Sequence, residues 1–239
     1  MTAPHFFAGD VGGDRILLRG EEARHAVRVL RIRPGETITI SDGRGTVVEA
    51  LVVETSREEL TADVKDRRAV PRAVPALHVL HAIPKAGKLD LVVQKLTELG
   101  VDVFQPFPAA RSVARWDERK AAQQTQRLAT IAREAAKQSR RAWLPEVVRS
   151  APLEAVDLPS PAYVLHEEAA TRLAETLPGK APAAVGLVVG PEGGLTAEEV
   201  SALSARGAEP VSLGPLVLRT ETAALVASVV LLGRYARIG

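Results

Sequence analysis

Residues 185–199 decide the fold class, and they read Val185-Gly-Leu-Val-Val-Gly-Pro-Glu-Gly-Gly-Leu-Thr-Ala-Glu-Glu199. The apolar run that ends in a glycine-rich turn is typical of a strand buried on both faces of a sheet. Thr196 and Glu199 have the spacing of a capping box, which predicts a helix after the turn. Strand, glycine turn and helix indicate an α/β sheet, in which ligands bind at the carboxyl ends of strands. A plain tight turn at Gly193-Gly194 would explain the segment taken alone equally well.

A second segment, residues 211–224, repeats this order of strand, glycine loop and helix. Arg219 and Glu221 stand between its apolar stretches. An acidic residue in the first turn of a helix is commonly a capping residue, which is one explanation of Glu221. A cation is unfavourable just before a helix begins, so the position of Arg219 indicates that it belongs to a functional site.

Strands and helices alternate around these two segments. Strand-like apolar runs are expected at 77–84, 101–107, 162–166, 185–190 and 209–213, and helices at 88–99 and 117–141. This alternation predicts a mostly parallel sheet with helices on both faces.

The first 70 residues show a different pattern. Alternation with period two at 15–19, 36–40 and 46–53 predicts short strands, and residues 21–33 contain one short helical pattern. We therefore expect a small β-barrel at 1–70. The proline- and arginine-rich stretch 67–75 is typical of an extended linker, so we place a linker at 71–76 and the α/β domain at 77–239.

Composition excludes several classes of protein. The chain has 239 residues, of which 46% are hydrophobic and 25% charged, figures typical of a globular protein. It has no cysteine, so disulfides and thiolate chemistry are excluded and a cytoplasmic location is expected by default. The N-terminus has no signal-peptide pattern, and the longest apolar run, 223–232, is too short to span a bilayer, so no membrane association is expected.

Known cofactor and metal motifs are also missing. The sequence contains no G-x-G-x-x-G fingerprint and no G-x-x-x-x-G-K-[ST] motif, which disfavours classical dinucleotide and nucleoside-triphosphate sites. No pair of its five histidines has metal-ligand spacing, so no metal is expected. No serine lies in a G-x-S-x-G context.

Basic residues are unevenly distributed. Residues 73–149 carry 13 basic and 7 acidic side chains, although the whole chain has a net charge of only +2. This imbalance indicates a surface for a polyanion, or simply a solvated charged helix. The basic residues that could contact RNA are Arg24, Arg28 and Arg31 at helical spacing, Lys85, Lys88 and Arg111 at the ends of strands, and Arg140 and Arg141. The last two end a helix, where cations are also favourable without any RNA.

Six motifs together resemble one known family. They are His25-Ala-Val-Arg-Val-Leu-Arg31, Gln94-Lys-Leu-Thr-Glu-Leu-Gly-Val101, Arg111-Ser-Val113, Glu134-Ala-Ala-Lys-Gln-Ser-Arg140, Gly190-Pro-Glu-Gly-Gly194 and Leu213-Gly-Pro-Leu-Val-Leu-Arg-Thr-Glu-Thr-Ala223. The chain resembles the RsmE family of 16S ribosomal RNA uracil-N3 methyltransferases, of the SPOUT class, over nearly its whole length.

The resemblance implies a fold, an activity and a partner. The fold is an N-terminal PUA-like RNA-binding barrel followed by a SPOUT α/β domain with a C-terminal trefoil knot, and the family is homodimeric. The activity is methylation by S-adenosylmethionine of N3 of a specific uridine in 16S rRNA of the assembled small ribosomal subunit. Residues matching the family's cofactor loops are Leu165, His166, Gly190, Pro191, Glu192, Gly193, Leu213, Gly214, Leu218 and Thr222.

Three positions depart from the family's pattern. Glu167 stands where the family usually has proline, which puts the contacts of that loop in question. Leu128 replaces a common tryptophan, which indicates a packing change. Arg140 replaces a glycine, so that Arg141 can be the match to the family's basic position.

The catalytic residues follow from the chemistry of the reaction. A uracil ring must lose the proton on N3, and a cation beside it favours the resulting anion. We assign this role to Arg219, while Glu221 would hold that arginine or relay the proton. Alternatively, Arg219 binds only a cofactor carboxylate or an RNA phosphate.

A non-catalytic RNA-binding or ribosome-assembly module is the alternative function of the protein. With only 3% aromatic residues, recognition should rest on shape and phosphate contacts rather than on stacking.

Overall fold

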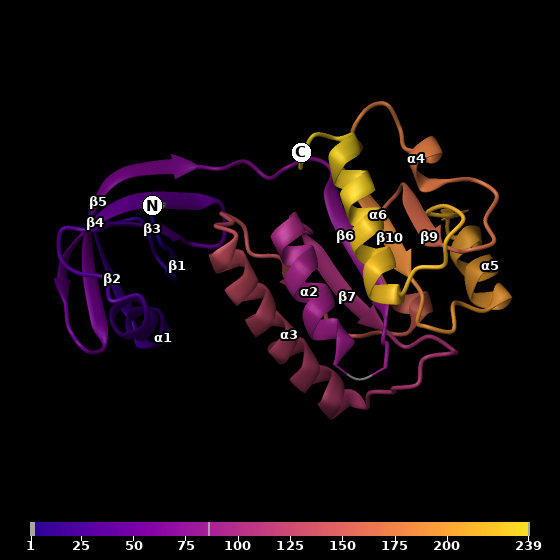
Figure 1. The fold of residues 1–239 in the computed structure, drawn as a ribbon, viewed down its shortest axis with the longest axis horizontal. Coiled ribbons are helices and arrows are strands. Elements are labelled where there is room, and N and C mark those ends of the chain that lie inside the picture. Colours follow the sequence, from indigo (N-terminus) through magenta and orange to yellow (C-terminus); the bar gives the residue numbers. More distant parts are fainter. Residues whose placement is uncertain (1–2, 86, 239) are drawn as a thin grey trace. The chain divides into compact units, whose positions relative to one another are not determined.

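A computed structural model describes residues 3–85 and 87–238, which fall into two compact units (Figure 1). Unit 1 contains the described residues up to Arg72 together with Ala136–Leu144. Unit 2 contains Ala73–Ala135 and the described residues from Pro145 onward.

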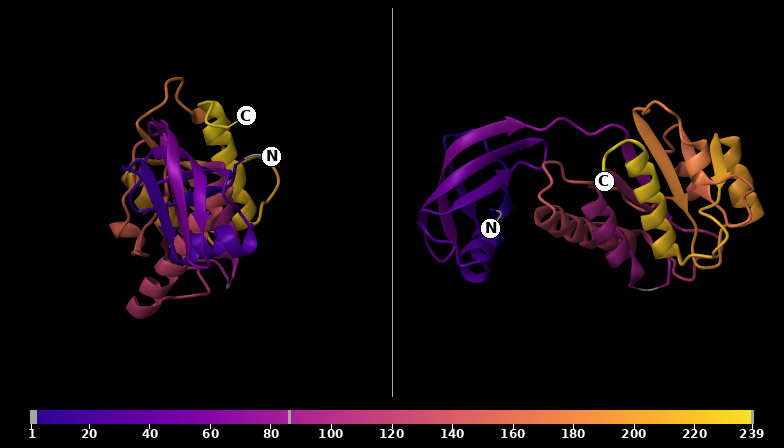
Figure 2. Two further views of the ribbon diagram at one scale, coloured as in Figure 1. Left: turned by 90° about the vertical axis from the view of Figure 1, so that its left-hand side faces the viewer. Right: turned by 45° about the horizontal axis from the view of Figure 1, so that its top comes forward.

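Unit 1 is built on a curled five-stranded sheet that forms a half-barrel (Figure 2). Its strands lie in the order β1-β3-β4-β5-β2. Their bounds are β1 His5–Phe7, β2 Arg15–Arg19, β3 Thr37–Ser41, β4 Thr46–Thr55 and β5 Glu59–Ala69. Alternating buried side chains, among them Ile38, Ile40 and Val48, fill one face of the sheet, as period-two patterning requires. The expected barrel-like unit with one helical segment is confirmed.

The helical segment of unit 1 is irregular. Helix α1 (Gly20–Arg24) continues directly into one π-helical turn, His25–Val29. The turn ends with Arg31 at a φ of 56°, the left-handed conformation that glycine usually supplies. This geometry lets the amide of Ile32 donate to the carbonyl of Ala26 (3.0 Å) and exposes Arg31.

The boundary between the two units differs from the sequence-based one. Strand β5 continues to Ala69, inside the stretch interpreted as a linker, and Ala76 already belongs to strand β6. Residues 136–144, placed by sequence in the α/β domain, pack in unit 1. The Nε1 of Trp143 donates to the carbonyl of Val70 (2.8 Å), and its ring fits against Gly45 so closely that a Cβ there would lie 2.4 Å away. Helical periodicity carries no signal of such long-range contacts.

Buried His5 makes the stability of unit 1 dependent on pH. Burial, followed by the charges of Arg140 and Arg68, lowers the pKa of His5 to about 4. Because the unfolded chain binds a proton on this ring more readily, stability is complete above pH ~6.5 and falls as the pH drops toward 4, by about 1–3 kcal/mol. Hydrogen exchange of β1 and β3 in the full chain measures this loss. In His5→Asn, the loss should be smaller, and an equal loss would exclude His5 as its cause.

Unit 2 is a six-stranded sheet in which every pairing is parallel, in the order β11-β9-β10-β6-β7-β8. The strands are β6 Ala76–Ala82, β7 Val103–Phe107, β8 Glu146–Val147, β9 Ala162–Leu165, β10 Ala184–Val189 and β11 Ala208–Val211. The helices are α2 Lys88–Leu99, α3 Glu118–Gln138, α4 Leu173–Thr176, α5 Ala197–Ala205 and α6 Thr220–Arg234. The final turn of α3 lies in unit 1.

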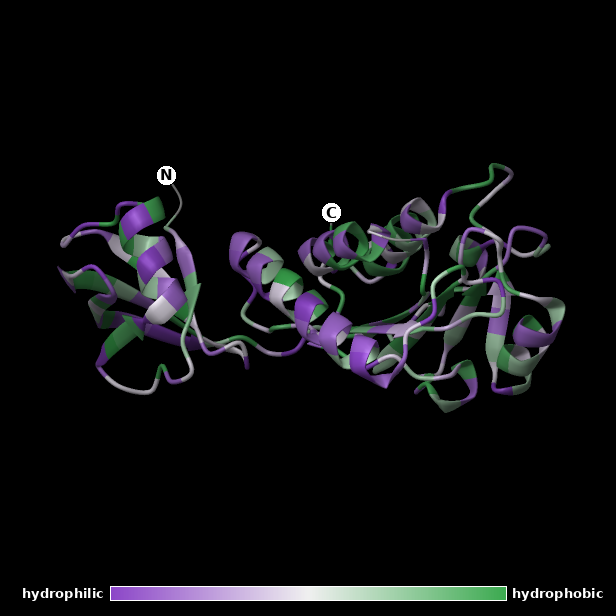
Figure 3. Cartoon of the chain, turned by 90° about the horizontal axis from the view of Figure 1, so that it is seen from below, coloured by the Kyte–Doolittle hydropathy of each residue, from purple (hydrophilic) through white to green (hydrophobic). Residues whose placement is uncertain are grey.

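Two hydrophobic cores cover the two faces of this sheet, which confirms the expected α/β architecture. One core contains side chains of α2, α3, α4 and α6, such as Val92, Leu128 and Leu231. The other contains Leu203 of α5 and Leu153 of a short 3-10 turn. Hydrophilic residues interrupt the apolar ones along α3, as expected of a helix with one solvated face (Figure 3).

Parallel pairing places the carboxyl ends of the inner strands at one edge. Val189 of β10 is in register with His81 of β6, and Val211 of β11 with Leu165 of β9. The glycine loops that follow β10 and β11 therefore leave the sheet at the same edge as the loop after β6. No helix among the described residues is long and apolar enough to cross a membrane.

Candidate active site

A cavity of about 680 Å³ lies at this edge of the sheet in unit 2. Its walls are the loops that follow β9, β10 and β11 together with the start of α6. It is lined by nine of the ten residues expected to hold a cofactor, namely Leu165, His166, Gly190, Pro191, Glu192, Gly193, Leu213, Gly214 and Leu218. Thr222 is exposed and does not line the cavity, which Thr220 and Ala223 line instead.

The Gly190-Pro-Glu-Gly-Gly194 turn forms one wall of the cavity. A Cβ on Gly190 would lie 3.2 Å from the amide nitrogen of Leu195, so a side chain there would force the backbone of the turn to shift. Gly194 has a φ of 70°, which favours glycine, and its amide donates to the carbonyl of Pro191 (2.9 Å). The Thr196–Glu199 capping box then starts α5, as predicted. The turn is thus both tight and part of a cavity wall.

The loop before α6 forms the opposite wall. Gly214 has a φ of 126°, and a Cβ there would meet no atom within 4 Å. Leu216 and Val217 line the cavity but are 78% and 80% exposed. Open space bounded by backbone and apolar side chains suits an organic ligand with a flat, partly apolar group.

A buried chain of contacts ties the first wall to α6. The hydroxyl of Thr220 donates to the carbonyl of Gly190 (2.6 Å) and lies 3.3 Å from Nε2 of His81. Nδ1 of His81 donates to the carbonyl of Ala82 (2.7 Å). Complete burial lowers the pKa of His81, so the ring is a neutral structural group. The chain of contacts fixes the start of α6 against the glycine turn.

A charged cluster joins the same elements at the surface. Nζ of Lys88 lies 3.0 Å from Glu192 and 3.2 Å from Glu221, and the backbone amide of Lys85 also donates to Glu192. Partial burial opposes ionisation of both carboxyls, but hydrogen bonds from backbone amides and Lys88 still lower the pKa of Glu192 and of Glu221. The two carboxylates raise the pKa of Lys88. Glu221 is therefore paired with Lys88 rather than with Arg219.

Arg219 lines the cavity without a partner among the described residues. It is the residue before the first turn of α6, makes no capping hydrogen bond, and is exposed. Its charge is close enough to contribute to the lowered pKa of Glu221. The arrangement offers one free guanidinium to an anion at the cavity.

The basic residues expected at the RNA surface of unit 2 are in different situations. Nη1 of Arg111 donates to the carbonyl of Gly193 (2.8 Å), so this side chain supports the glycine turn and lines the cavity. Lys88 is bound by two carboxylates. Lys85 is exposed, and its ammonium group has no ion-pair partner in the described residues.

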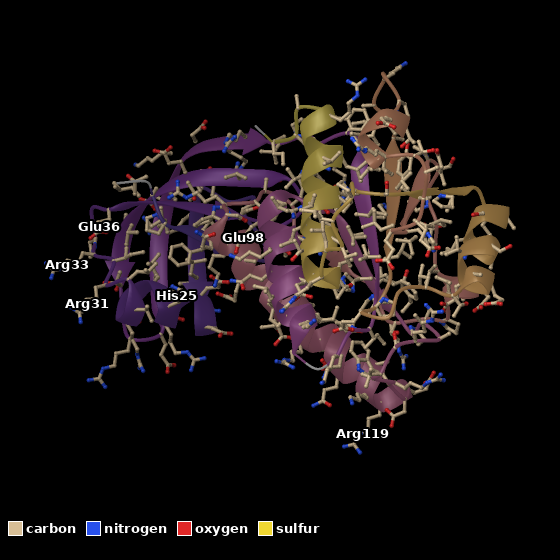
Figure 4. All side chains as sticks on the ribbon, turned by 45° about the vertical axis from the view of Figure 1, so that its right-hand side comes forward. His25, Arg31, Arg33, Glu36, Glu98 and Arg119 are labelled. Atoms are coloured by element: carbon tan, nitrogen blue, oxygen red, sulfur yellow. The ribbon has the colours of Figure 1, made fainter. Side chains whose placement is uncertain are left out.

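Unit 1 exposes the three expected basic residues of its helical segment. Arg24, Arg28 and Arg31 are exposed, and none of them is paired with another described side chain. Figure 4 shows Arg31 and Arg33 extending away from unit 1, while His25 lies against it, 6.4 Å from the ring of Phe6. Sequence reasoning missed Arg33, which lies beyond the helical spacing that identified the others.

Arg140 and Arg141 follow the last turn of α3 in unit 1. Arg140 has a φ of 56° and is exposed. This left-handed conformation explains why the family pattern has glycine at the position. Arginine at this position is strained by its backbone but places a cation at the surface.

Two of the residues whose role sequence reasoning missed, His81 and Thr220, are buried. His81 and Thr220 make the contacts that fix α6, but a histidine within an apolar strand looks like a packed side chain. Glu167 and Glu168 also line the cavity, in the loop where the family pattern differs. No group of His, Cys, Asp or Glu that could hold a metal ion occurs among residues 3–85 and 87–238.

The parallel α/β sheet with a cavity at its strand ends, together with a separate half-barrel unit, defines the chain as a two-domain α/β protein. The family model described as RNA methyltransferase domain matches residues 71–232, and that of the RNA methyltransferase PUA domain matches residues 18–65. The chain belongs to the RNA methyltransferase family.

Individual relatives support the same assignment. The ribosomal RNA small subunit methyltransferase E of Mycobacterium bovis is 42% identical over 216 residues, covering 87% of this chain and 82% of the relative. That of Bacillus subtilis is 33% identical over 223 residues, covering 88% and 86%. The crystal structure of the Neisseria gonorrhoeae enzyme bound to S-adenosyl methionine superposes with a TM-score of 0.87 at 27% identity, covering 98% of each chain.

Proposed function

We propose that this protein methylates N3 of a specific uridine in 16S ribosomal RNA, using S-adenosylmethionine and acting on the assembled small subunit. The observation that carries the proposal is the cavity between the Gly190–Gly194 turn and the Leu213–Arg219 loop, with a free guanidinium at its edge. Family membership supports RNA as the substrate, and the names of the relatives support the small ribosomal subunit.

The cavity fits the cofactor in size and chemistry. Its volume of about 680 Å³ lies within the range of pockets for ligands of this size. The space beside Gly214 and the exposed apolar side chains of Leu216 and Val217 suit a nucleoside. When bound, S-adenosylmethionine supplies a methyl group activated by a positively charged sulfur. The residues we propose to hold it are the nine expected residues that line the cavity.

Arg219 is the residue we propose to act on the uracil. N3 of the ring becomes nucleophilic when it loses its proton, and a guanidinium nearby stabilises the ring anion that results. We propose that Glu221 acts through its negative charge and its position and does not relay the proton of N3. A carboxyl with a lowered pKa is a weak base. Arg219 could instead bind a phosphate or a cofactor carboxylate. The lysine substitution described in the Discussion distinguishes this role from stabilisation of the uracil anion.

Mass spectrometry of small-subunit RNA from a strain that lacks the gene tests the function. Loss of one N3-methyluridine, restored by the parent gene, is the expected result. A methyluridine content equal to that of the wild-type strain would contradict it. If calorimetry also showed no binding of S-adenosylmethionine, the alternative of a non-catalytic RNA-binding or ribosome-assembly module would replace it.

The exposed arginines of unit 1 are proposed to bind RNA phosphates. The double variant Arg28→Ala/Arg31→Ala should weaken binding to small subunits and reduce the slope of log affinity against log salt by about 2. Affinity for S-adenosylmethionine should stay at the parent value, because the cofactor cavity is lined by unit 2 alone. An unchanged salt slope would mean that these arginines form only a solvated surface.

We further propose that the protein is a homodimer through helices of unit 2. Val226 and Val229 are 36% and 43% exposed on α6, whereas Ala224, Ala227 and Leu231 of the same helix are buried in the core. Light scattering at micromolar concentration should give twice the chain mass, and Val226→Glu/Val229→Glu should give the mass of one chain. A monomeric parent at that concentration would contradict this proposal.

A further inference from the structure

The cluster of Lys88, Glu192 and Glu221 brings together three elements that the proposed reaction uses. Lys88 is the first residue of α2, Glu192 belongs to the glycine turn, and Glu221 is the second residue of α6. One ammonium group contacts both carboxylates, at 3.0 and 3.2 Å. Lys88 is therefore the charged counterpart of the buried Thr220–Gly190 hydrogen bond, which joins the same turn to the same helix.

Lys88 offsets part of the negative charge at the cavity edge, because its ammonium group contacts both Glu192 and Glu221. Glu192 and Arg219 line the cavity and Glu221 lies beside it. The other guanidinium that lines the cavity, that of Arg111, is bound to the carbonyl of Gly193, and the carboxylates of Glu167 and Glu168 belong to the loop after β9. Without the ammonium group, Arg219 would be the remaining cation whose charge acts on Glu221. Glu221 is two residues from Arg219, on the first turn of α6, and its oxygen atoms would be the nearest anionic partner for the guanidinium. A guanidinium held in that way is not available to a uracil anion.

We propose that Lys88 is a positioning residue: by binding Glu221 and Glu192, it keeps Arg219 free for the substrate, and it does not contact RNA phosphate. This inference rests on the proposed function, and it assigns to Lys88 a role different from the RNA contact expected from sequence. The side chain is 30% exposed and both carboxylates lie within 3.2 Å, so an RNA phosphate would have to displace two anions that are already bound.

A double-mutant cycle tests whether Lys88 acts through Glu221. The proteins are the parent, Lys88→Met, Glu221→Gln and the double variant, compared by single-turnover methylation of small subunits at saturating cofactor. Lys88→Met should slow the reaction by about tenfold or more in the parent background but only about twofold in the Glu221→Gln background. Losses that multiply in the double variant would overturn the inference. Lys88→Arg should recover most of the rate, because it restores the cation.

Lys85→Met is the matched control for an RNA contact. Lys85 stands three positions away and has an exposed ammonium group without an ion-pair partner in the described chain. Lys85→Met should raise KM for small subunits and lower its salt dependence, and its effect on KM should be larger than its effect on the single-turnover rate at saturation. If Lys88→Met had this same signature, Lys88 would be an RNA contact and the inference would be wrong.

An NMR measurement provides a readout that does not depend on activity. The Nε–H of Arg219 should exchange quickly with water in the parent, slowly in Lys88→Met where it pairs with Glu221, and quickly again in the double variant. Exchange that does not change among these proteins would overturn the inference. If the three proteins showed this pattern of exchange but the parent methylated no small subunit, the proposed function would be overturned instead. The two failures are therefore distinguishable.

Discussion

Replacing Arg219 with lysine is expected to leave the protein folded and able to bind S-adenosylmethionine, while slowing methylation by about a hundredfold to a thousandfold. The side chain of Arg219 makes no capping hydrogen bond, and its backbone carbonyl, which accepts from the amide of Ala223 (2.8 Å), is kept in the variant, so the substitution should not destabilise unit 2. Lysine keeps the positive charge but loses the planar group with several donors. A site that stabilises a flat ring anion depends on that geometry and should therefore lose rate rather than affinity.

The measurement is single-turnover methylation of small subunits at saturating cofactor, with calorimetry of cofactor binding beside it. Arg219→Met, which removes the charge as well, should be at least as slow as the lysine variant. If Arg219 met a phosphate or a cofactor carboxylate as a point charge, Arg219→Lys would react at nearly the parent rate. That result would remove Arg219 from the catalytic role.

Gly190→Val should reduce the affinity for S-adenosylmethionine by about a hundredfold. A Cβ at this position would lie 3.2 Å from both the amide nitrogen and Cγ of Leu195, and 3.4 Å from the carbonyl carbon of Gly194. Backbone atoms cannot move aside as the end of a flexible side chain can, so the turn itself must shift. The shift would also strain the Thr220–Gly190 hydrogen bond that holds α6.

Gly193→Ala serves as the comparison within the same turn. Its Cβ would lie 3.4 Å from Cβ of Arg111, an ordinary contact with a side chain, and should therefore cost much less affinity. Calorimetry compares the two variants, and circular dichroism reports whether each remains folded. If the two variants lost equal affinity, the added side-chain volume beside the cavity, and not a shift of the backbone of the turn, would be the cause of the loss.

Local patterns were sufficient to predict the α/β unit and the position of its cavity. The expected helix at 88–99 coincides with α2, and the Thr196–Glu199 capping box starts α5 as predicted. Both signals lie within a few residues of the structure they specify. Parallel strands then bring the glycine loops to one edge, so residues far apart in sequence could be assigned to one site.

Long-range pairing accounts for what the sequence did not reveal. Strand β1 has only three residues and pairs in parallel with β3 across more than thirty positions, so periodicity could not identify it. From the sequence, Lys88 was expected to contact RNA at the end of a strand. Nothing near it along the chain shows that Glu192 and Glu221 are its ion-pair partners. The partners of a surface charge are set by the fold and not by local spacing.

The return of residues 136–144 to unit 1 has a consequence for the order of events during synthesis. The ribosome releases the chain from its N-terminus, and domains generally fold as they emerge. Trp143, whose ring covers Gly45 and whose Nε1 donates to the carbonyl of Val70, is translated after strands β6 and β7 and helices α2 and α3. Unit 1 therefore cannot complete its folding until these strands and helices of unit 2 have been translated, and a nascent chain that ends at Arg72 cannot reach the final structure of unit 1.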